Sequence, residues 1–186
     1  MVARPVQLRP GARTPTQPLE GTITMSTIAE RVAAALAAET GEAVTSADVT
    51  RSPFGEYWIG RAGGVTVFAE RGRAHIFLGD SFFVYDNMAM STSVEAIRAA
   101  IRAAREDRAV AEELCGWLEY AGWKRVTATK DWGQWRVTAV SGRDDGYAVH
   151  ATVVGGHVFL PPLEHDATAW ESVLNLLERN GVPVSR

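Results

Sequence analysis

The chain has 186 residues, 46% of them hydrophobic, and a formal net charge of -3. This length suits one ordinary domain or two small units that share a core, and the weak negative charge gives no bulk attraction to nucleic acid or to an anionic membrane. The single cysteine, Cys115, cannot form an intramolecular disulfide, and no apolar run approaches the roughly 18 residues of a membrane helix, so we expect a cytoplasmic, soluble protein.

The first segment, residues 1–24, contains four prolines and three arginines, and no acidic residue before Glu20. It has no continuous apolar stretch, which argues against a standard secretory signal. We therefore predict a disordered basic tail. Met25 stands immediately before a helix start signal, so the alternative is that the tail is an over-long reading of the start codon.

Three threonines each stand three residues before a glutamate, which is the spacing of the capping box that opens helices. They are Thr27, Thr92 and Thr168, and apolar residues at helical spacing follow each of them. A fourth helix is predicted over residues 109–120. We expect the chain to break before it, near Glu106–Asp107, because Asp107 can cap a new helix and the apolar residues on its two sides point about half a turn apart.

Between the helices the hydrophobic pattern changes to a period of two, which is typical of strands. Residues 65–78 predict a hairpin with a turn at Arg71–Gly72, and residues 147–160 predict another with a turn at Gly155–Gly156. A further strand is expected before each hairpin, over residues 54–60 and 132–138. The inward face of the two hairpins comprises Val65, Val67, Ala69, Ala74, Ile76 and Leu78, and Tyr147, Val149, Ala151, Val153, Val158 and Leu160.

Several segments of the first half recur in the second half. "RAHIFLGD" and "GGHVFLPP" share His, a β-branched residue, Phe and Leu in one order, and "IAERVAAAL" resembles "VAEELCGWL". We predict an α+β fold made by tandem duplication of an α-β-β-β(-β)-α unit, residues 25–106 and 107–186, with antiparallel sheets and helices mainly on one face. The alternative is that two α+β units look alike without a common origin.

The outward face of the predicted hairpins carries Phe68, His75, Phe77, His157 and Phe159. A sheet with helices on one side should show polar residues on the other, and this face is too apolar for that. Either the sister repeat covers it, or a partner protein, a second copy of the chain or a ligand does.

The histidines do not predict a metal site. With Gly155–Gly156 as the turn, His150 lies four rungs along the ladder from His157, about 13 Å away, whereas zinc ligands lie about 2 Å from the ion. We expect no cofactor, and the chain contains no common hydrolase, phosphate-binding or metalloprotease motif.

Four arginines fall at helical spacing after Thr92, on one flank of the predicted helix: Arg98, Arg102, Arg105 and Arg108. The stripe predicts a weak binding site for an acidic partner or phosphates, and the alternative is an ordinary solvated helix face, because Glu95, Glu106 and Asp107 dilute the charge.

Together these features favour a non-enzymatic protein-binding or chaperone-like adaptor that uses the apolar sheet face, with another protein or a second copy as its partner. In architecture, though in no motif, the predicted fold resembles the α+β modules of bacterial secretion chaperones. The alternative is a small enzyme or ligand-binding protein in which His150, His157 or His165 acts as acid or base in a pocket between the repeats. A nucleic-acid contact is not expected.

Overall fold

The computed structural model of the chain describes residues 26–53, 55–80, 83–141, 148–160 and 167–185. The predicted tail at residues 1–24 and the residues Tyr147 and His165 lie outside the described residues. The described part contains three α-helices and two five-stranded sheets, which confirms the α+β class.

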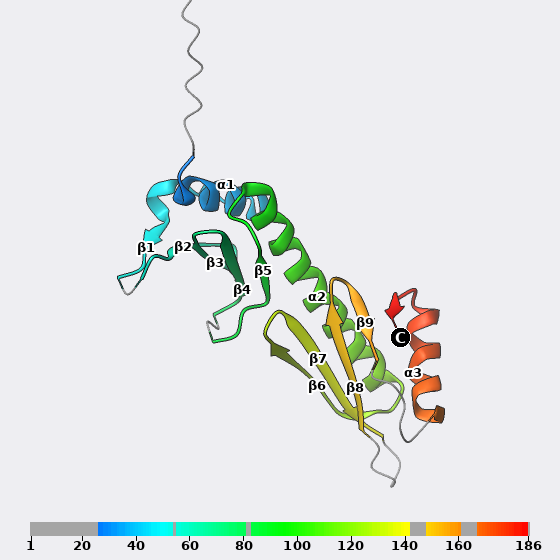
Figure 1. Ribbon diagram of the computed structural model, residues 1–186. Coiled ribbons are helices and arrows are strands. Elements are labelled where there is room, and N and C mark those ends of the chain that lie inside the picture. Colours follow the sequence, from blue (N-terminus) through cyan, green and yellow to red (C-terminus); the bar gives the residue numbers. More distant parts are fainter. Residues whose placement is uncertain (1–25, 54, 81–82, 142–147, 161–166, 186) are drawn as a thin grey trace, which may run out of the picture.

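The first sheet has the strand order β1-β2-β3-β4-β5, and every neighbouring pair is antiparallel. Helix α1 and the first half of α2 lie along one side of it (Figure 1). The strands of this sheet are β1 (Thr50–Arg51), β2 (Trp58–Ala62), β3 (Val65–Glu70), β4 (Arg73–Leu78) and β5 (Asn87–Ala89), and they are preceded in the chain by α1 (Ile28–Thr40) and the short 3-10 helix η1 (Ser46–Asp48).

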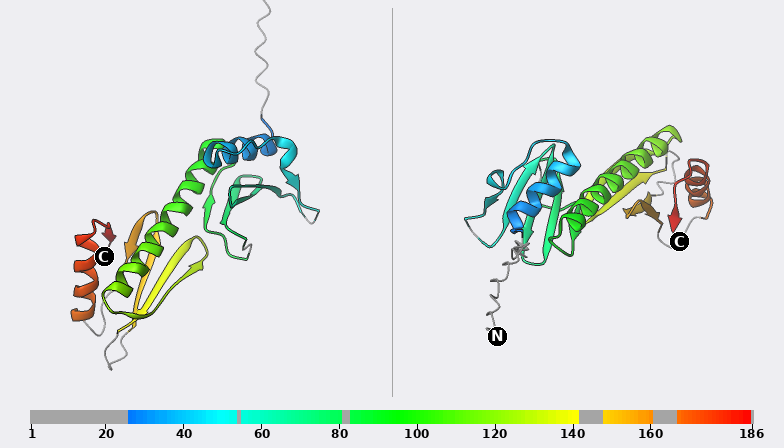
Figure 2. Two further views of the ribbon diagram at one scale, coloured as in Figure 1. Left: turned by 180° about the vertical axis from the view of Figure 1, so that it is seen from behind. Right: turned by 90° about the horizontal axis from the view of Figure 1, so that it is seen from above.

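The second sheet has the order β10-β9-β8-β7-β6 and is antiparallel except for the short parallel pair β9–β10. Figure 2 shows it beside the second half of α2, with α3 at the far end of the molecule. The strands of this sheet are β6 (Lys124–Asp131), β7 (Gln134–Val140), β8 (Ala148–Val154), β9 (His157–Phe159) and β10 (Val184–Ser185). Helix α2 (Val94–Tyr120) precedes them in the chain, and α3 (Ala167–Arg179) lies between β9 and β10 in the sequence.

Of the three predicted capping boxes, only the first is present. Thr27 precedes α1, and its hydroxyl accepts from the Glu30 amide while the Glu30 carboxylate accepts from the Thr27 amide. The box at Thr92 is wrong by one residue, because Ser93 is the cap and accepts from the Ala96 amide at 3.2 Å. The box at Thr168 is also wrong, since α3 already begins at Ala167.

Both predicted hairpins are confirmed, including their turns. Glu70 pairs with Arg73 across Arg71–Gly72, and Val154 pairs with His157 across Gly155–Gly156. The inward residues predicted on the first hairpin are all buried against α1 and α2, and Val149, Ala151, Val153 and Val158 are buried in a second cluster. Alternating burial and two-residue turns together fix the strand register.

The predicted break in the helix near Glu106–Asp107 is wrong, because α2 runs unbroken from Val94 to Tyr120. Residues 102–110 contain neither Gly nor Pro and are mostly good helix formers, so nothing in the backbone stops the helix there. Asp107 does not cap a helix. Its side chain is fully buried, and its Oδ1 accepts from the Gly156 amide at 2.6 Å.

The two halves of α2 do not face opposite directions as predicted. The buried residues recur three or four positions apart along one stripe, which drifts only slightly from one heptad to the next. Both sheets therefore pack on the same side of α2, and the helix is shared between the two hydrophobic clusters. The stripe contains Ile97, Ile101, Ala104, Asp107, Ala111, Leu114 and Leu118.

The tandem duplication is not established by the fold and stays a prediction, as does the boundary between residues 106 and 107, which falls inside α2. The two echoed segments differ in their distance from the turn. His157 is the first residue after its turn, whereas His75 is the third after its own. Both histidines lie opposite the buried face, but at ladder positions two residues apart.

The turn between β8 and β9 is fixed to the middle of α2. Gly155 and Gly156 both have positive φ, as a two-residue hairpin turn requires, and a Cβ on Gly156 would stand 2.9 Å from the Glu106 carboxylate. Burial raises the pKa of Asp107, against the hydrogen bonds from the Gly156 and Gly155 amides, which lower it, and the neighbouring Glu106 charge adds to the increase. The contact therefore holds a desolvated carboxylate in place.

This raised pKa predicts a pH-dependent stability. The folded protein binds the Asp107 proton more tightly than the unfolded chain, so the free energy of unfolding falls as pH rises from about 4 through the folded pKa. Asn keeps the acceptor for Gly156 without titrating. In urea unfolding at constant ionic strength, the free energy of unfolding of Asp107→Asn minus that of the wild type should increase as pH rises through this range. A difference that stays constant or shrinks would contradict the prediction.

Candidate functional site

A pocket of about 380 Å³ lies on the face of the first sheet opposite α1 and α2. Phe68 on β3 and His75 and Phe77 on β4 form its floor, as their outward positions predict, and the Phe68 and Phe77 rings meet edge to face with centroids 5.2 Å apart. We call it the aromatic pocket. It is lined by Tyr57, Phe68, His75, Phe77, Phe83, Tyr85 and Trp132.

The rim of the aromatic pocket is unusually exposed for large apolar side chains. Phe83 is 90% exposed, Trp132 is 63% exposed and Tyr57 is 37% exposed, whereas Phe77 on the floor is only 8% exposed. Rings that lie open to water around a buried aromatic floor are typical of a surface that binds something.

Trp132 comes from the other sheet and is held in an uncommon backbone conformation. Trp132 and Gly133 form the two-residue turn between β6 and β7, and both have positive φ, 28° and 78°. A tryptophan there is strained, since such turns favour Asn, Asp or Gly. The turn meets the segment before β5, where the Gly133 amide donates to the Tyr85 carbonyl at 3.1 Å and the Trp132 and Tyr85 rings lie 5.5 Å apart.

A buried ion pair fixes this turn to the first sheet. The Asp86 side chain is fully buried, and its Oδ2 accepts from the Leu78 amide at 2.6 Å and from the Lys130 Nζ at 3.2 Å. The other oxygen, Oδ1, is buried without a hydrogen-bond partner among the described residues. Because Lys130 precedes the turn by two residues, the pair places Trp132 against the pocket.

His75 lies on the floor beside a carboxylate. Its Nε2 is 3.8 Å from the Glu70 Oε1, and its ring meets the Tyr85 ring with centroids 5.1 Å apart. Glu70 is also bonded to the Arg73 guanidinium. Burial, and next the positive charge of Arg73, lower the pKa of His75, which favours the neutral imidazole.

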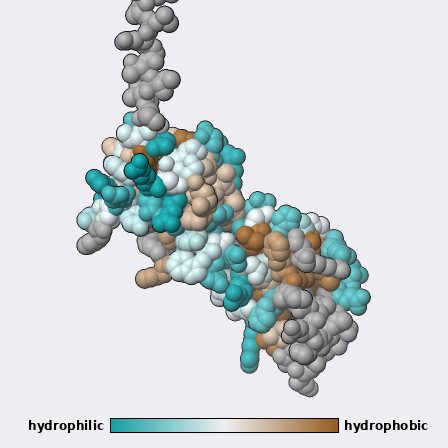
Figure 3. Space-filling view, viewed as in Figure 1, coloured by the Kyte–Doolittle hydropathy of each residue, from teal (hydrophilic) through white to brown (hydrophobic). Residues whose placement is uncertain are grey.

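The other predicted sheet-face residues lie elsewhere. His157 and Phe159 are on β9 of the second sheet, exposed, with ring centroids 6.4 Å apart, and neither lines the aromatic pocket. His150, also exposed, pairs with Thr138 on β7. The outer face of this sheet is largely polar, and the Thr127 and Thr138 hydroxyls share a hydrogen bond of 2.7 Å. Figure 3 shows a patch of hydrophobic residues around the second sheet, bordered by hydrophilic residues.

Sequence reasoning found the floor of the pocket and missed its rim. Tyr57, Phe83 and Tyr85 lie in connections between strands, where no periodicity assigns a direction, and Trp132 arrives from the other sheet. The usable signal is the Trp–Gly dipeptide at residues 132–133, which the hydrophobic pattern assigns to the start of a strand although it forms a turn.

The predicted arginines divide into two groups along α2. Arg98 and Arg102 both bind the carboxylate of Glu39, with shortest distances of 2.8 Å and 2.7 Å. Arg105 instead donates to the Glu39 carbonyl oxygen at 2.9 Å, and Arg108 pairs with Glu112 at 2.8 Å. The hydrogen bond from Arg102 is the largest cause that lowers the pKa of Glu39 to about 2, with Arg98 contributing, against burial, which raises it.

None of the helices in the described part of the chain is both long and apolar enough to cross a membrane. Among the same residues, no three His, Cys, Asp or Glu side chains come close enough together to hold a metal ion. The chain matches no protein-family model, no curated protein and no solved structure.

Removing the lysine of the buried ion pair should destabilise the protein strongly. Lys130→Met leaves the Asp86 carboxylate buried without a counter-charge, at a cost of about 3 kcal/mol in the free energy of unfolding. Lys124→Met, at the exposed start of the same strand, should change it by less than about 0.5 kcal/mol. Equal effects in chemical denaturation would show that the pair with Asp86 does not hold the turn.

Glu39 should stabilise the packing of α1 against α2 in a pH-dependent way. Since its folded pKa lies below the ordinary 4.5, its stabilisation is complete above pH 4.5 and is lost as pH falls towards 2. We expect Glu39→Gln to lower the free energy of unfolding at pH 7 by about 2 kcal/mol, after allowing for screening of the exposed arginines. The difference should vanish near pH 2, and the same change at exposed Glu42 should have little effect at any pH.

Proposed function

We propose that the chain is a non-enzymatic protein-binding module, and that the aromatic pocket receives apolar side chains of a partner protein. The observation that carries the proposal is a set of six aromatic rings and one histidine around a pocket of about 380 Å³, with the rings of the rim open to solvent. Burial of those exposed rings by a partner is the favourable event.

The size of the aromatic pocket admits a side chain as its occupant. Pockets that enclose whole small molecules or cofactors have volumes of roughly 300–1,000 Å³, and this one is near the lower limit. Protein interfaces are commonly dominated by one or two aromatic or aliphatic anchors that fill such a pocket. A partner that inserts one or two large apolar side chains therefore fits the space.

The charges around the aromatic pocket support a neutral anchor. Glu70 is paired with Arg73, Asp86 is paired with Lys130, and the lowered pKa of His75 favours its neutral form. With its neighbouring charges compensated, the pocket offers no ion pair to a charged side chain, which would lose its hydration on entry. Aromatic and branched aliphatic side chains are the class favoured.

The conformation of Trp132 supports a binding role rather than a purely structural one. A residue with positive φ at this turn costs roughly 1–2 kcal/mol unless it is Gly, Asn or Asp. The strain puts a large, mostly exposed ring at the rim, where it contacts Tyr85. Strained residues of this kind are concentrated at functional sites.

The other functional hypotheses drawn from the sequence have fewer observations behind them than the protein-binding role. The chaperone-like role depends on architecture alone, and the cytoplasmic location depends on the lone Cys115. The enzymatic alternative places an acid or base among His150, His157 and His165. Of the described pair, neither His150 nor His157 lines the aromatic pocket, whereas His75 does. A second copy of the chain as partner is distinguished by the solution mass of the protein.

The test replaces two rim residues and leaves the floor intact. Phe83→Ser with Trp132→Asn removes both exposed rings, and Asn suits the positive φ, so the free energy of unfolding should fall by no more than about 0.5 kcal/mol. Peptides selected from a random dodecapeptide library on the wild type should carry a shared aromatic or aliphatic anchor. The double variant should bind them about 30-fold more weakly.

The matched control is Tyr120→Ser, which removes a ring that is 94% exposed at the end of α2, away from the aromatic pocket. It should bind the selected peptides as the wild type does. Selection of no common anchor, or equal binding by the double variant, would overturn the proposal. A wild type that is dimeric in light scattering and monomeric after the rim substitutions would replace the partner protein with a second copy.

A further inference from the structure

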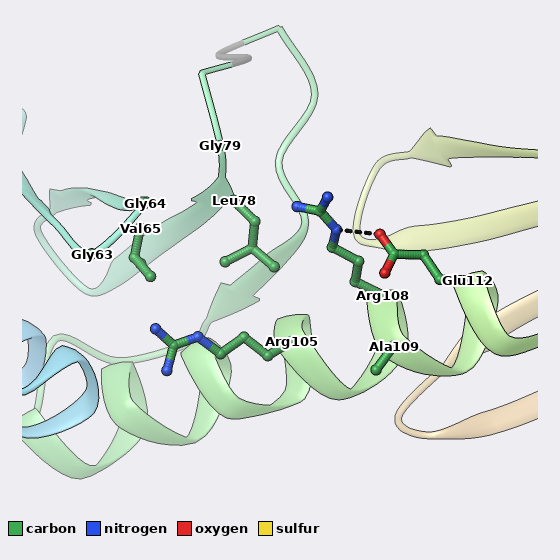
Figure 4. A pocket seen from close by; sticks show the side chains of 9 residues that line it. All are labelled: Gly63, Gly64, Val65, Leu78, Gly79, Arg105, Arg108, Ala109 and Glu112. Atoms are coloured by element: carbon green, nitrogen blue, oxygen red, sulfur yellow. Dashed lines mark hydrogen bonds and ion pairs between the residues drawn. The ribbon is translucent and has the colours of Figure 1, made fainter.

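A second pocket, of about 330 Å³, lies between α2 and the ends of strands β2 to β4, on the side of the first sheet that faces the helix. Figure 4 shows Val65 and Leu78 reaching from the sheet towards α2, with the Arg105 and Arg108 side chains extending from the helix on either side of the space. We call it the arginine cleft. It is lined by Gly63, Gly64, Val65, Leu78, Gly79, Arg105, Arg108, Ala109 and Glu112.

Arg105 contributes a positive charge to the arginine cleft. The Glu39 carboxylate, 8% exposed, already accepts from both Arg98 and Arg102. Arg105 reaches the same residue but finds only its carbonyl oxygen, and it forms no ion pair with a described residue. The carbonyl holds the guanidinium in place without the counter-charge of a described carboxylate.

The second guanidinium of the cleft is only partly engaged. Arg108 uses its Nε to bind one oxygen of Glu112, and the two side chains are 46% and 60% exposed. An exposed pair one helical turn apart is weak, so the Arg108 guanidinium remains open to a competing anion. The cleft therefore carries two guanidinium groups and one carboxylate, a net positive charge.

The wall opposite the arginines is apolar. Val65 and Leu78 pair with each other at the end of the β3–β4 ladder, and the Gly79 amide donates to the Gly64 carbonyl at 2.8 Å, which ties the two turns together. A Cβ added at Gly64 or Gly79 would have no other atom within 4 Å, so the space beside these glycines is open. Ala109 adds a small apolar patch on the helix. A short aliphatic body fits this part of the cleft.

We propose that the arginine cleft binds a small organic oxyanion, a carboxylate or phosphate monoester whose short aliphatic body lies against Val65, Leu78 and Ala109. The planar guanidinium groups of Arg105 and Arg108 bind its oxygens through paired N–H donors. The ligand displaces the Glu112 carboxylate from Arg108. This site is separate from the aromatic pocket and does not depend on the proposed function.

The experiment titrates the full chain with two probes that share one aliphatic body, 4-methylpentanoate and isopentyl phosphate, with acetate as the headgroup control. Binding is followed by the amide NMR signals of Gly63, Gly64 and Gly79 at constant ionic strength. We expect saturable shifts at these glycines, with at least one of the two probes binding about tenfold more tightly than acetate because of its aliphatic body. The preferred probe identifies the oxyanion.

Four variants separate the proposed site from general charge attraction. Arg105→Gln should weaken binding about tenfold by removing the uncompensated charge, and Ala109→Met should weaken it similarly by filling the cleft without changing its charge. Glu112→Gln should strengthen binding several-fold by freeing Arg108. Arg71→Gln, at the exposed β3–β4 turn, should have no effect beyond a small change in salt dependence.

The site is established if Arg105→Gln and Ala109→Met both weaken probe binding while Glu112→Gln strengthens it. The proposal is overturned if no probe shifts the three glycine signals saturably, or if Arg105→Gln and Arg71→Gln weaken binding equally. Circular dichroism of each variant checks that the fold is retained, and Ala109→Met keeps the test valid if Arg105→Gln unfolds.

Discussion

The single buried stripe of α2 is the constraint on which the rest of the molecule depends. Because its buried residues recur every three or four positions from Ile97 to Leu118, both sheets must pack on one side of a straight helix. The second sheet thus lies next to the first instead of on its outer face. In the described part of the chain that face is left open, and the β6–β7 turn, with Lys130 just before it, reaches the segment at its edge.

Two buried carboxylates fix the position of the second sheet against α2 and the first sheet. Asp107 holds the β8–β9 turn against the middle of α2, and Asp86 holds Lys130 of β6 beside the first sheet. Each leaves one oxygen without a hydrogen-bond partner among the described residues, so each contact carries a desolvation penalty. Apolar packing at these points would avoid that penalty but would be less directional. The polar contacts specify the position of each hairpin, and the second contact positions Trp132 at the rim of the aromatic pocket.

The elements that local chemistry determines were predictable, and those decided by tertiary contacts were not. The hairpins follow from alternating burial and from Arg71–Gly72 and Gly155–Gly156, which act over a few residues. The break at Asp107 was predicted from its capping tendency, which the contact with Gly156 overrides. Likewise Ser93 and Thr92 are both good caps, and sequence alone does not choose between them. The pocket floor follows from strand alternation, whereas its rim depends on how two sheets meet.

The end of β4 shows how one strand serves two sites of different chemistry. Phe77 and Leu78 are adjacent, so the period of two sends the first into the aromatic pocket and the second into the arginine cleft. The sheet itself separates the aromatic pocket, whose described lining contains no Lys or Arg, from the arginine cleft, where Arg105 has no ion pair with a described residue. An apolar anchor gains nothing from that guanidinium, and the described lining of the aromatic pocket offers an oxyanion no cationic side chain. The two faces therefore select different ligands, although a single strand end contributes a wall to each.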